Sequence, residues 1–276
     1  MSRAIPPLRL SFGLVLLSMW SWSPARAASP QATIIDTAGG CDSTAERGNL
    51  AGQLTTAGYT VNTITTGVVP ASLSGQQQVW DIRCSTVLAA GEITTYTNYL
   101  VGGGSLFLMG ENTGFAPARD NSLLAFIGTL GGGTLTLTSS SNTQTAQPPF
   151  NGNGLSTVTF RAIGGTTTPG TGSFVTKDQN DAYGGSLVFS PGSMSNASAG
   201  TLIIVFDVNF LDNDRSASET LFTGNLIAYL AAPAPITGTP APPTLILALM
   251  GAMAVLLVGL RRARRLEAGA GESNSC

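Results

Sequence analysis

The feature of this chain that most constrains its fold is an uncharged apolar stretch near its end. Thr244–Leu260 holds seventeen residues without Asp, Glu, Lys or Arg. As a helix rising about 1.5 Å per residue it measures roughly 25 Å, slightly less than the ~30 Å hydrocarbon core of a bilayer. Positive charge stays on the cytoplasmic side of a membrane, so the body of the protein is expected to face outward. The alternative, a buried core helix, does not account for the arginines beside this stretch or for the Pro-rich segment before it. The arginines that follow it are Arg261, Arg262, Arg264 and Arg265.

The start of the chain predicts export. Arg3 and Arg9 precede or border the apolar run Leu10–Trp20, and Ala25-Arg26-Ala27 supplies the small-x-small pattern of a signal-peptidase site. A Pro-rich stretch before the apolar segment has the composition of an extended spacer. The expected organisation is a signal peptide (1–27), an exported domain (28–232), a spacer (233–243), a transmembrane helix (244–260) and a cytoplasmic basic tail (261–276).

Charge and residue types exclude several classes of function. Residues 28–243 hold six basic and thirteen acidic side chains, a net charge of −7. A nucleic-acid partner requires a basic surface to neutralise phosphates, and none is present. The chain contains no histidine, which removes Ser-His-Asp and Cys-His hydrolases and every histidine-ligated metal. We expect no cofactor.

The pattern of the exported part predicts an α/β domain. Short apolar runs alternate with amphipathic segments, which is typical of βαβ units and a mainly parallel sheet. Residues 134–200 are rich in Thr, Ser, Gly and Asn and predict an antiparallel β insertion, with hairpin-type turns at Asn151-Gly152 and Asn153-Gly154. The expected strands are Thr33–Asp36, Tyr59–Thr65, Val79–Cys84, Ser105–Met109 and Thr201–Phe206, and within the insertion Thr134–Thr138, Ser156–Arg161, Ser173–Thr176 and Ser186–Phe189.

Four helices are expected between these strands and after the last one. The first and the last begin at the capping-box patterns Ser43-x-x-Glu46 and Ser216-x-x-Glu219. The two between them have apolar faces formed by Ile93, Tyr96 and Leu100 and by Leu123, Leu124, Ile127 and Leu130.

Polar residues that follow the expected parallel strands are the candidates for a ligand site. Ligands of open parallel sheets bind beyond the carboxyl ends of the strands. Paired carboxylates about 5 to 10 Å apart can act as acid and base on a glycosidic bond. The competing interpretation is that each carboxylate accepts backbone N–H groups at its own turn or helix start. The candidates are Asp36, Glu111, Asn112, Asp207 and Asn209.

A second interpretation of the segment that begins at Asp207 is an irregular calcium site. Asp207, Asp212 and Asp214 place several oxygen ligands close together in the sequence. An EF-hand register fails, because Ala217 stands where the glycine is required and Thr223 where the final glutamate is required. A solvated acidic loop is the alternative.

Two cysteines of the exported part are expected to pair. Cys41 and Cys84 are 43 positions apart, and on the chain-entropy account a disulfide closing such a loop adds roughly 4 kcal/mol to stability. An oxidising compartment outside the cytoplasm favours the bond over free thiols.

The end of the chain resembles the sorting tails of exosortase-type systems, the PEP-CTERM family and its Ile-Pro-Thr-Leu relatives in Gram-negative bacteria. The resemblance lies in Pro240-Ala241-Pro242-Pro243-Thr244-Leu245, the apolar run Ile246–Leu260 and the arginine cluster. It implies that Pro242, Pro243 and Thr244 belong to a motif that a sorting protease recognises. The domain would then be anchored in the inner membrane facing the periplasm, or transferred to the cell surface after sorting.

The exported part resembles the class I glutamine amidotransferase-like fold, a flavodoxin-like three-layer sandwich whose family includes non-catalytic and sugar-associated members. The run Tyr99–Asn112 carries the resemblance, which covers Ala32–Gly133 and Thr201–Ala231. At the turn where that family places its cysteine nucleophile this chain has Gly110-Glu111-Asn112. Amidase chemistry is therefore not expected here.

Together these observations predict an exported, membrane-anchored cell-envelope protein whose domain is not an enzyme and serves in binding or in matrix interaction. An extracellular polysaccharide is the expected partner, besides the membrane and a sorting protease. The alternative is a carbohydrate-active hydrolase that uses paired carboxylates among Asp36, Glu111 and Asp207.

Overall fold

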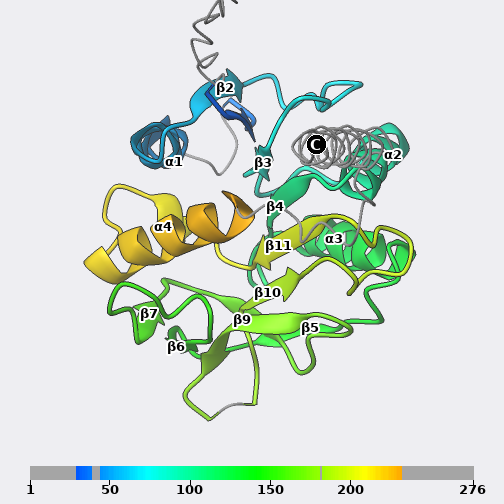
Figure 1. The fold of residues 1–276 in the computed structure, drawn as a ribbon. Coiled ribbons are helices and arrows are strands. Elements are labelled where there is room, and N and C mark those ends of the chain that lie inside the picture. Colours follow the sequence, from blue (N-terminus) through cyan, green and yellow to red (C-terminus); the bar gives the residue numbers. More distant parts are fainter. Residues whose placement is uncertain (1–28, 39–43, 181, 232–276) are drawn as a thin grey trace, which may run out of the picture.

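The structure is a computed structural model that describes residues 29–38, 44–180 and 182–231 (Figure 1). Within these residues four α-helices and one short 3-10 helix alternate with eleven strands. In chain order the elements are β1 (Gln31–Ile35), α1 (Thr44–Thr56), β2 (Thr60–Ile64), β3 (Gln78–Asp81), α2 (Ala90–Val101), β4 (Ser105–Met109), α3 (Pro117–Thr129), β5 (Leu137–Ser139), β6 (Thr143–Ala146), β7 (Thr157–Thr159), β8 (Gly164–Thr166), β9 (Ser173–Asp178), β10 (Ser186–Phe189), β11 (Thr201–Val205), η1 (Asn209–Leu211) and α4 (Ala217–Ala231).

One large sheet runs through the domain. Its nine strands have the order β2-β1-β3-β4-β11-β10-β9-β6-β7. The first five are parallel to one another, and the pairs from β11 through β7 are antiparallel. The α/β class and the largely parallel sheet predicted from the sequence are confirmed.

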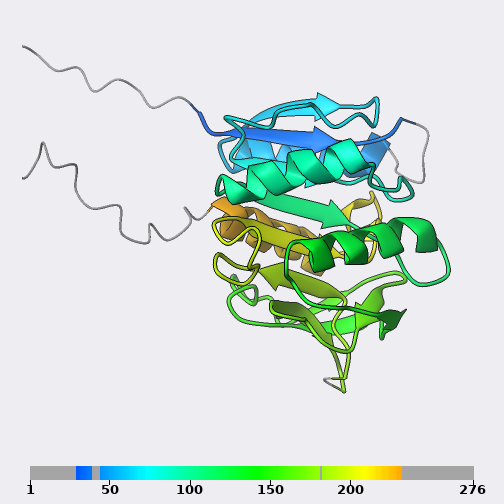
Figure 2. The same ribbon diagram turned by 90° about the vertical axis from the view of Figure 1, so that its right-hand side faces the viewer.

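Helices cover both faces of the parallel half (Figures 1 and 2). On one face α1 and α4 pack with Trp80, Phe107 and Phe222, and on the other α2 and α3 pack with Tyr96 and Phe126. Trp80 and Phe107 stack with ring centroids 4.5 Å apart. Strands β3, β4 and β11 have no exposed residue, because they lie between two helical layers. This explains why β4 and β11 appear in the sequence as nearly continuous apolar runs.

Local sequence signals explain where the last helix begins. The Ser216 Oγ atom accepts the backbone N–H of Glu219 at 3.3 Å, and the Glu219 carboxylate accepts the backbone N–H of Ser216 at 2.6 Å. These reciprocal bonds are the capping box that the sequence predicts for α4. Asn153 and Gly154, predicted to form a turn, both have positive φ angles, 58° and 81°.

The β-rich segment 134–200 is antiparallel as predicted, and it is joined to the main sheet. Strands β10, β9, β6 and β7 extend the sheet beyond β11, while β5 and β8 form a separate two-stranded sheet. The predicted strands do not include β6 and β8, because Thr-, Gln- and Gly-rich strands of three or four residues carry no alternating apolar pattern. The predicted strand Val79–Cys84 is too long at its end: β3 ends at Asp81, whose Oδ1 atom accepts the backbone N–H of Arg83 where the chain turns.

Within residues 29–38, 44–180 and 182–231, no helix has both the length and the apolar character needed to cross a bilayer. The predicted span 244–260, the sorting motif and the leader lie outside this part of the chain. In Figure 2 the start of β1 and the end of α4 lie on the same side of the domain, at the amino ends of the parallel strands.

Candidate functional site

The carboxyl ends of the parallel strands carry the predicted acidic residues. Asp36 follows β1, Glu111 follows β4 and Asp207 follows β11, and all three side chains are buried. Strands β4 and β11 are neighbours, whereas β3 separates β1 from β4. The fold therefore brings Glu111 and Asp207 together and keeps Asp36 apart.

Glu111 joins two loops at this edge. Its Oε2 atom accepts the backbone N–H and the side-chain Nδ2–H of Asn112, both at 2.9 Å. Its Oε1 atom accepts the backbone N–H of Val208 at 2.9 Å. Burial raises the pKa of Glu111, the N–H donors lower it, and the nearby Asp207 charge raises it further. Both carboxylate oxygens are thus engaged by donors of the protein itself.

Asp207 is engaged in the same manner. Its Oδ2 atom accepts the backbone N–H groups of Arg161 at 3.0 Å and Ala162 at 3.3 Å, and its Oδ1 atom accepts that of Asn209 at 2.8 Å. Burial raises the pKa of Asp207 above its ordinary value, although the three N–H donors lower it. The Asn209 side chain has no hydrogen-bond partner among the described residues, so only its backbone takes part in this arrangement.

Asp36 is held by a cation instead of by the other carboxylates. Arg47, on α1, donates to Asp36 Oδ2, and the backbone N–H of Thr37 donates to Asp36 Oδ1 at 2.6 Å. The Arg47 side chain is 20% exposed and that of Asp36 1%. This ion pair fastens the first helix to the end of β1.

A fourth carboxylate at this edge, Asp120, is not among the predicted site residues. It lies in the first turn of α3, and its Oδ1 atom accepts the backbone N–H of Glu111 at 2.8 Å. Its Oδ2 atom is buried and has no hydrogen-bond partner among the described residues. Burial is the main cause that raises the pKa of Asp120 to about 7, and the Glu111 charge acts in the same direction. An acidic first turn is common in helices, so no sequence signal distinguished this residue.

A buried ionic network lies beside these carboxylates, after β3. Asp81 accepts two hydrogen bonds from Arg83, at 2.9 and 2.7 Å, and one from the Tyr96 hydroxyl at 2.9 Å. Arg83 also donates to Glu92 at 2.7 Å. The Arg119 Nη2 atom lies 3.2 Å from Asp81 without hydrogen-bond geometry. Burial alone would raise the pKa of Asp81, but the two arginines lower it to about 2.

The network was not predicted, because its members come from three separate segments of the chain. Asp81, Arg83, Glu92 and Arg119 meet only when β3, α2 and α3 are packed. Each is an unremarkable charged residue in the sequence, and pairing in the interior is what makes burial of these charges tolerable.

The predicted calcium ligands do not assemble. Among the described residues, no three His, Cys, Asp or Glu side chains form a group able to hold a metal ion. Asp207 is engaged by backbone donors, as above, while Asp214 is exposed and pairs with Arg161. Asp207, Asp212 and Asp214 therefore do not form a metal-binding group, which corrects the calcium hypothesis.

Cys84 is buried and disulfide-bonded. Its predicted partner, Cys41, lies outside the described residues. The pairing of these two cysteines thus stays a prediction.

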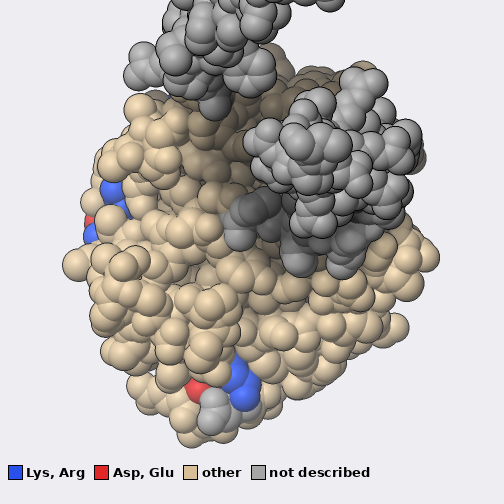
Figure 3. All heavy atoms as spheres, viewed as in Figure 1, with Lys and Arg blue, Asp and Glu red and all other residues tan. Residues whose placement is uncertain are grey.

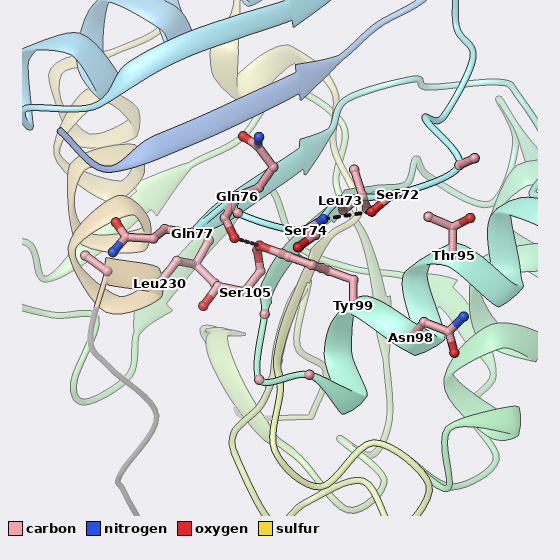
Figure 4. A pocket seen from close by; sticks show the side chains of 16 residues that line it. Ser72, Leu73, Ser74, Gln76, Gln77, Thr95, Asn98, Tyr99, Ser105 and Leu230 are labelled. Carbon is pink, nitrogen blue, oxygen red and sulfur yellow. Dashed lines mark hydrogen bonds between the residues drawn. The ribbon is translucent and has the colours of Figure 1, made fainter. Parts of the chain in front are cut away.

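A cavity of about 690 Å³ lies at the opposite edge of the sheet, where the parallel strands begin. Its wall includes the segment 71–77 before β3, the end of α2, the Gly102–Gly104 turn, Ser105 at the start of β4, and Leu230 with Ala231 at the end of α4. Figure 4 shows Tyr99 in the middle of this cavity, with Gln77 and Asn98 on opposite sides of it. The predicted site residues all follow the carboxyl ends of the strands, so none of them lies in this cavity.

No protein-family model matches the chain, and no curated protein matches it. The chain is similar to several solved structures. The mmIFT52 N-terminal domain matches with a TM-score of 0.55 at 9% identity, over 78% of this chain and all of that one. An exo-beta-1,4-mannosidase from Opitutaceae bacterium strain TAV5 matches with a TM-score of 0.49 at 14% identity, over 75% of this chain and 36% of that one.

A third match is a ThuA-like protein from Parabacteroides merdae ATCC 43184, with a TM-score of 0.48 at 9% identity, over 77% of this chain and 94% of that one. The mmIFT52 N-terminal domain, with a TM-score above 0.5, shows a similar fold, and its 9% identity shows nothing about activity.

Proposed function

We propose that this chain is an exported, membrane-anchored cell-envelope protein whose α/β domain binds a ligand or the surrounding matrix and does not catalyse a reaction. The observation that supports the absence of catalysis is the burial of the acidic side chains at the carboxyl edge of the sheet. Glu111 and Asp207 are at most 2% exposed and hold backbone N–H groups. A general acid or base has to reach the proton that it transfers, and these side chains are turned inward.

The finer fold assignment belongs to the same proposal. The parallel strands follow the order β2-β1-β3-β4-β11, which is the order of flavodoxin-like sheets. This order supports a flavodoxin-like sandwich of the amidotransferase-like type. Glu111 occupies the turn after β4 where that family has its nucleophile, and here the side chain ties β4 to the loop after β11.

The anchored location rests on the sequence. The arginine cluster after residue 260 and the apolar stretch before it predict a single span with the domain outside. Because the described part starts and ends at one edge of the sheet (Figure 2), a tether there would leave the carboxyl edge facing away from the membrane.

Membrane fractionation and mass spectrometry of the mature protein test the location. We expect the mature chain to begin near Ala28 and to stay with the membrane after washing with high salt. A mature C-terminus between residues 240 and 260 would support cleavage by a sorting protease, whereas an intact Arg261–Cys276 peptide would leave a plain single-span anchor. Full-length protein that is soluble inside the cell with its leader uncut would refute export.

Turnover assays test the non-catalytic part. We expect the full-length protein to release no product from polysaccharides, and Glu111→Gln and Asp207→Asn to lower the free energy of unfolding by about 1–2 kcal/mol each. The pair of adjacent acids with raised pKa values is the one observation that favours the alternative, a carbohydrate-active hydrolase. Product release by the wild type that Glu111→Gln abolishes, with the variant still folded, would establish that alternative.

A further inference from the structure

We infer that the cavity at the amino edge of the sheet is a binding site for neutral, polyhydroxylated ligands, that is, for uncharged sugar residues. The inference rests on the proposed function, since it names the ligand class of a binding domain. It places the ligand at the edge opposite to Glu111 and Asp207.

The cavity wall is polar and carries no charge. None of its described lining residues is Asp, Glu, Lys or Arg. The side chains of Gln77, Asn98, Ser74 and Ser105 line it and have no hydrogen-bond partner among the described residues. Amides and hydroxyls each offer donors and acceptors together, which is what the hydroxyl groups of a sugar require. A phosphate or carboxylate ligand would find no cation in this wall.

Two helix ends strengthen this selectivity. Asn98 and Tyr99 in the last turn of α2 and the last two residues of α4 line the cavity. The carboxyl end of a helix carries partial negative charge. Such ends disfavour anions. Since no carboxylate lines the described wall, a cationic ligand would keep an unbalanced charge, and a neutral hydroxylated ligand fits best.

The Gly102–Gly104 turn gives the cavity a fixed aromatic surface. The Tyr99 hydroxyl lies 3.2 Å from the carbonyl oxygen of Gln76 and 3.3 Å from that of Ser105, which holds the ring in place. A Cβ atom on Gly104 would lie 2.4 Å from the Tyr99 ring, so only glycine allows the ring to lie there. The ring therefore offers a positioned apolar face between polar side chains, an arrangement suited to ligands with both polar edges and apolar faces.

The size of the cavity and the surface around it agree with such a ligand. Its volume of about 690 Å³ falls in the ~300–1,000 Å³ range of small-molecule sites. The described face shown in Figure 3 is almost entirely uncharged, with charged atoms confined to small spots. Most acidic side chains among the described residues are buried, so the surface offers few carboxylates that would attract a cationic ligand instead.

A titration of the full-length protein tests the inference. The protein is kept in a detergent without a sugar headgroup and titrated calorimetrically with neutral gluco-, manno- and galacto-oligosaccharides of three residues, and separately with inorganic phosphate. Flotation with vesicles that contain a neutral glycolipid distinguishes a lipid headgroup from a free glycan as the source of the sugar. Asn98→Trp fills the cavity from an exposed helix position. Thr94→Trp, exposed on the same helix and outside the cavity, is the matched control.

We expect binding of at least one oligosaccharide or of the glycolipid vesicles, a loss of tenfold or more in affinity with Asn98→Trp, and wild-type affinity with Thr94→Trp. Binding to no sugar probe, tighter binding of phosphate, or equal binding by both variants would overturn the inference. These outcomes are separate from those of the proposed function, because a chain found inside the cell or with hydrolase activity could still bind sugar in this cavity. A chain that binds no sugar could still be exported, anchored and inert.

Discussion

At the scale of single residues, burial decides what each charged side chain does. Glu111 and Asp207 each hold loop backbone groups, and Asp81 is ionised between two arginines. Asp120 differs from them because one of its oxygens is buried without a hydrogen-bond partner among the described residues. A carboxylate in that position is stabilised by binding a proton, which is why its pKa rises to about 7.

The raised pKa of Asp120 predicts how stability changes with pH. A folded-state pKa above the ordinary value of about 3.8 stabilises the fold fully at low pH, and this stabilisation is lost as pH rises from about 4 through 7. We expect Asp120→Asn to reduce the fall of the unfolding free energy over this interval and to raise that free energy at pH 8 by ~1–2 kcal/mol. Urea unfolding at several pH values measures both effects.

The control for this substitution is Asp214→Asn, at an exposed ion pair with Arg161. We expect a change below about 0.5 kcal/mol at pH 8. An unchanged pH profile in Asp120→Asn would show that Asp120 is ionised throughout and that its burial is compensated.

At the scale of elements, two glycines have opposite roles in the packing. Gly104 lies between α2 and β4, where an added Cβ would overlap the Tyr99 ring at 2.4 Å. Gly52 lies inside α1, and a Cβ there would meet no atom within 4 Å. The helix leaves room for a Cβ atom at Gly52, whereas the cavity wall leaves none at Gly104.

This contrast predicts opposite effects of alanine. Gly104→Ala should displace the Tyr99 ring and lower the free energy of unfolding by about 1–3 kcal/mol. Gly52→Ala should raise it by about 0.5–1 kcal/mol, because glycine is costly inside a helix. Denaturant unfolding with tyrosine fluorescence measures both changes. Equal effects of the two substitutions would mean that the contact between Tyr99 and Gly104 is not maintained in solution.

At the scale of the whole molecule, the domain has two chemically different edges. The carboxyl edge is closed by buried acids and by the network around Asp81, while the amino edge is hollowed and uncharged. Cys84, in the segment after β3, adds a covalent link to this arrangement. Disulfides form in oxidising compartments, and export of the domain to such a compartment stays a prediction.

The predicted disulfide can be tested across the whole chain. Cys41→Ser and Cys84→Ser should each lower the free energy of unfolding by roughly 2–4 kcal/mol, and a reducing agent should do the same to the wild type. Cys276→Ser, in the predicted cytoplasmic tail, should have no effect. Alkylation and peptide mapping without reduction should leave Cys41 and Cys84 unlabelled, and labelling of Cys41 would show that Cys84 has another partner.

The sequence by itself determined the elements of the parallel half and their class. Strands β1, β2, β3, β4 and β11 and all four helices were predicted near their observed positions, because buried strands and amphipathic helices leave strong periodic patterns. The capping box of α4 could also be predicted, because its hydrogen bonds join residues three positions apart in the sequence.

Only the tertiary structure decided which of these residues meet. Glu111 lies beside Asp207, whereas Asp36 forms an ion pair with Arg47. The network around Asp81 joins residues from separate segments of the chain. The tertiary structure also showed that the hollow lies at the amino edge, formed by two helix ends and a glycine turn. Local patterns reflect contacts between near neighbours along the chain. A site depends on contacts between distant segments, and these form only when the layers pack.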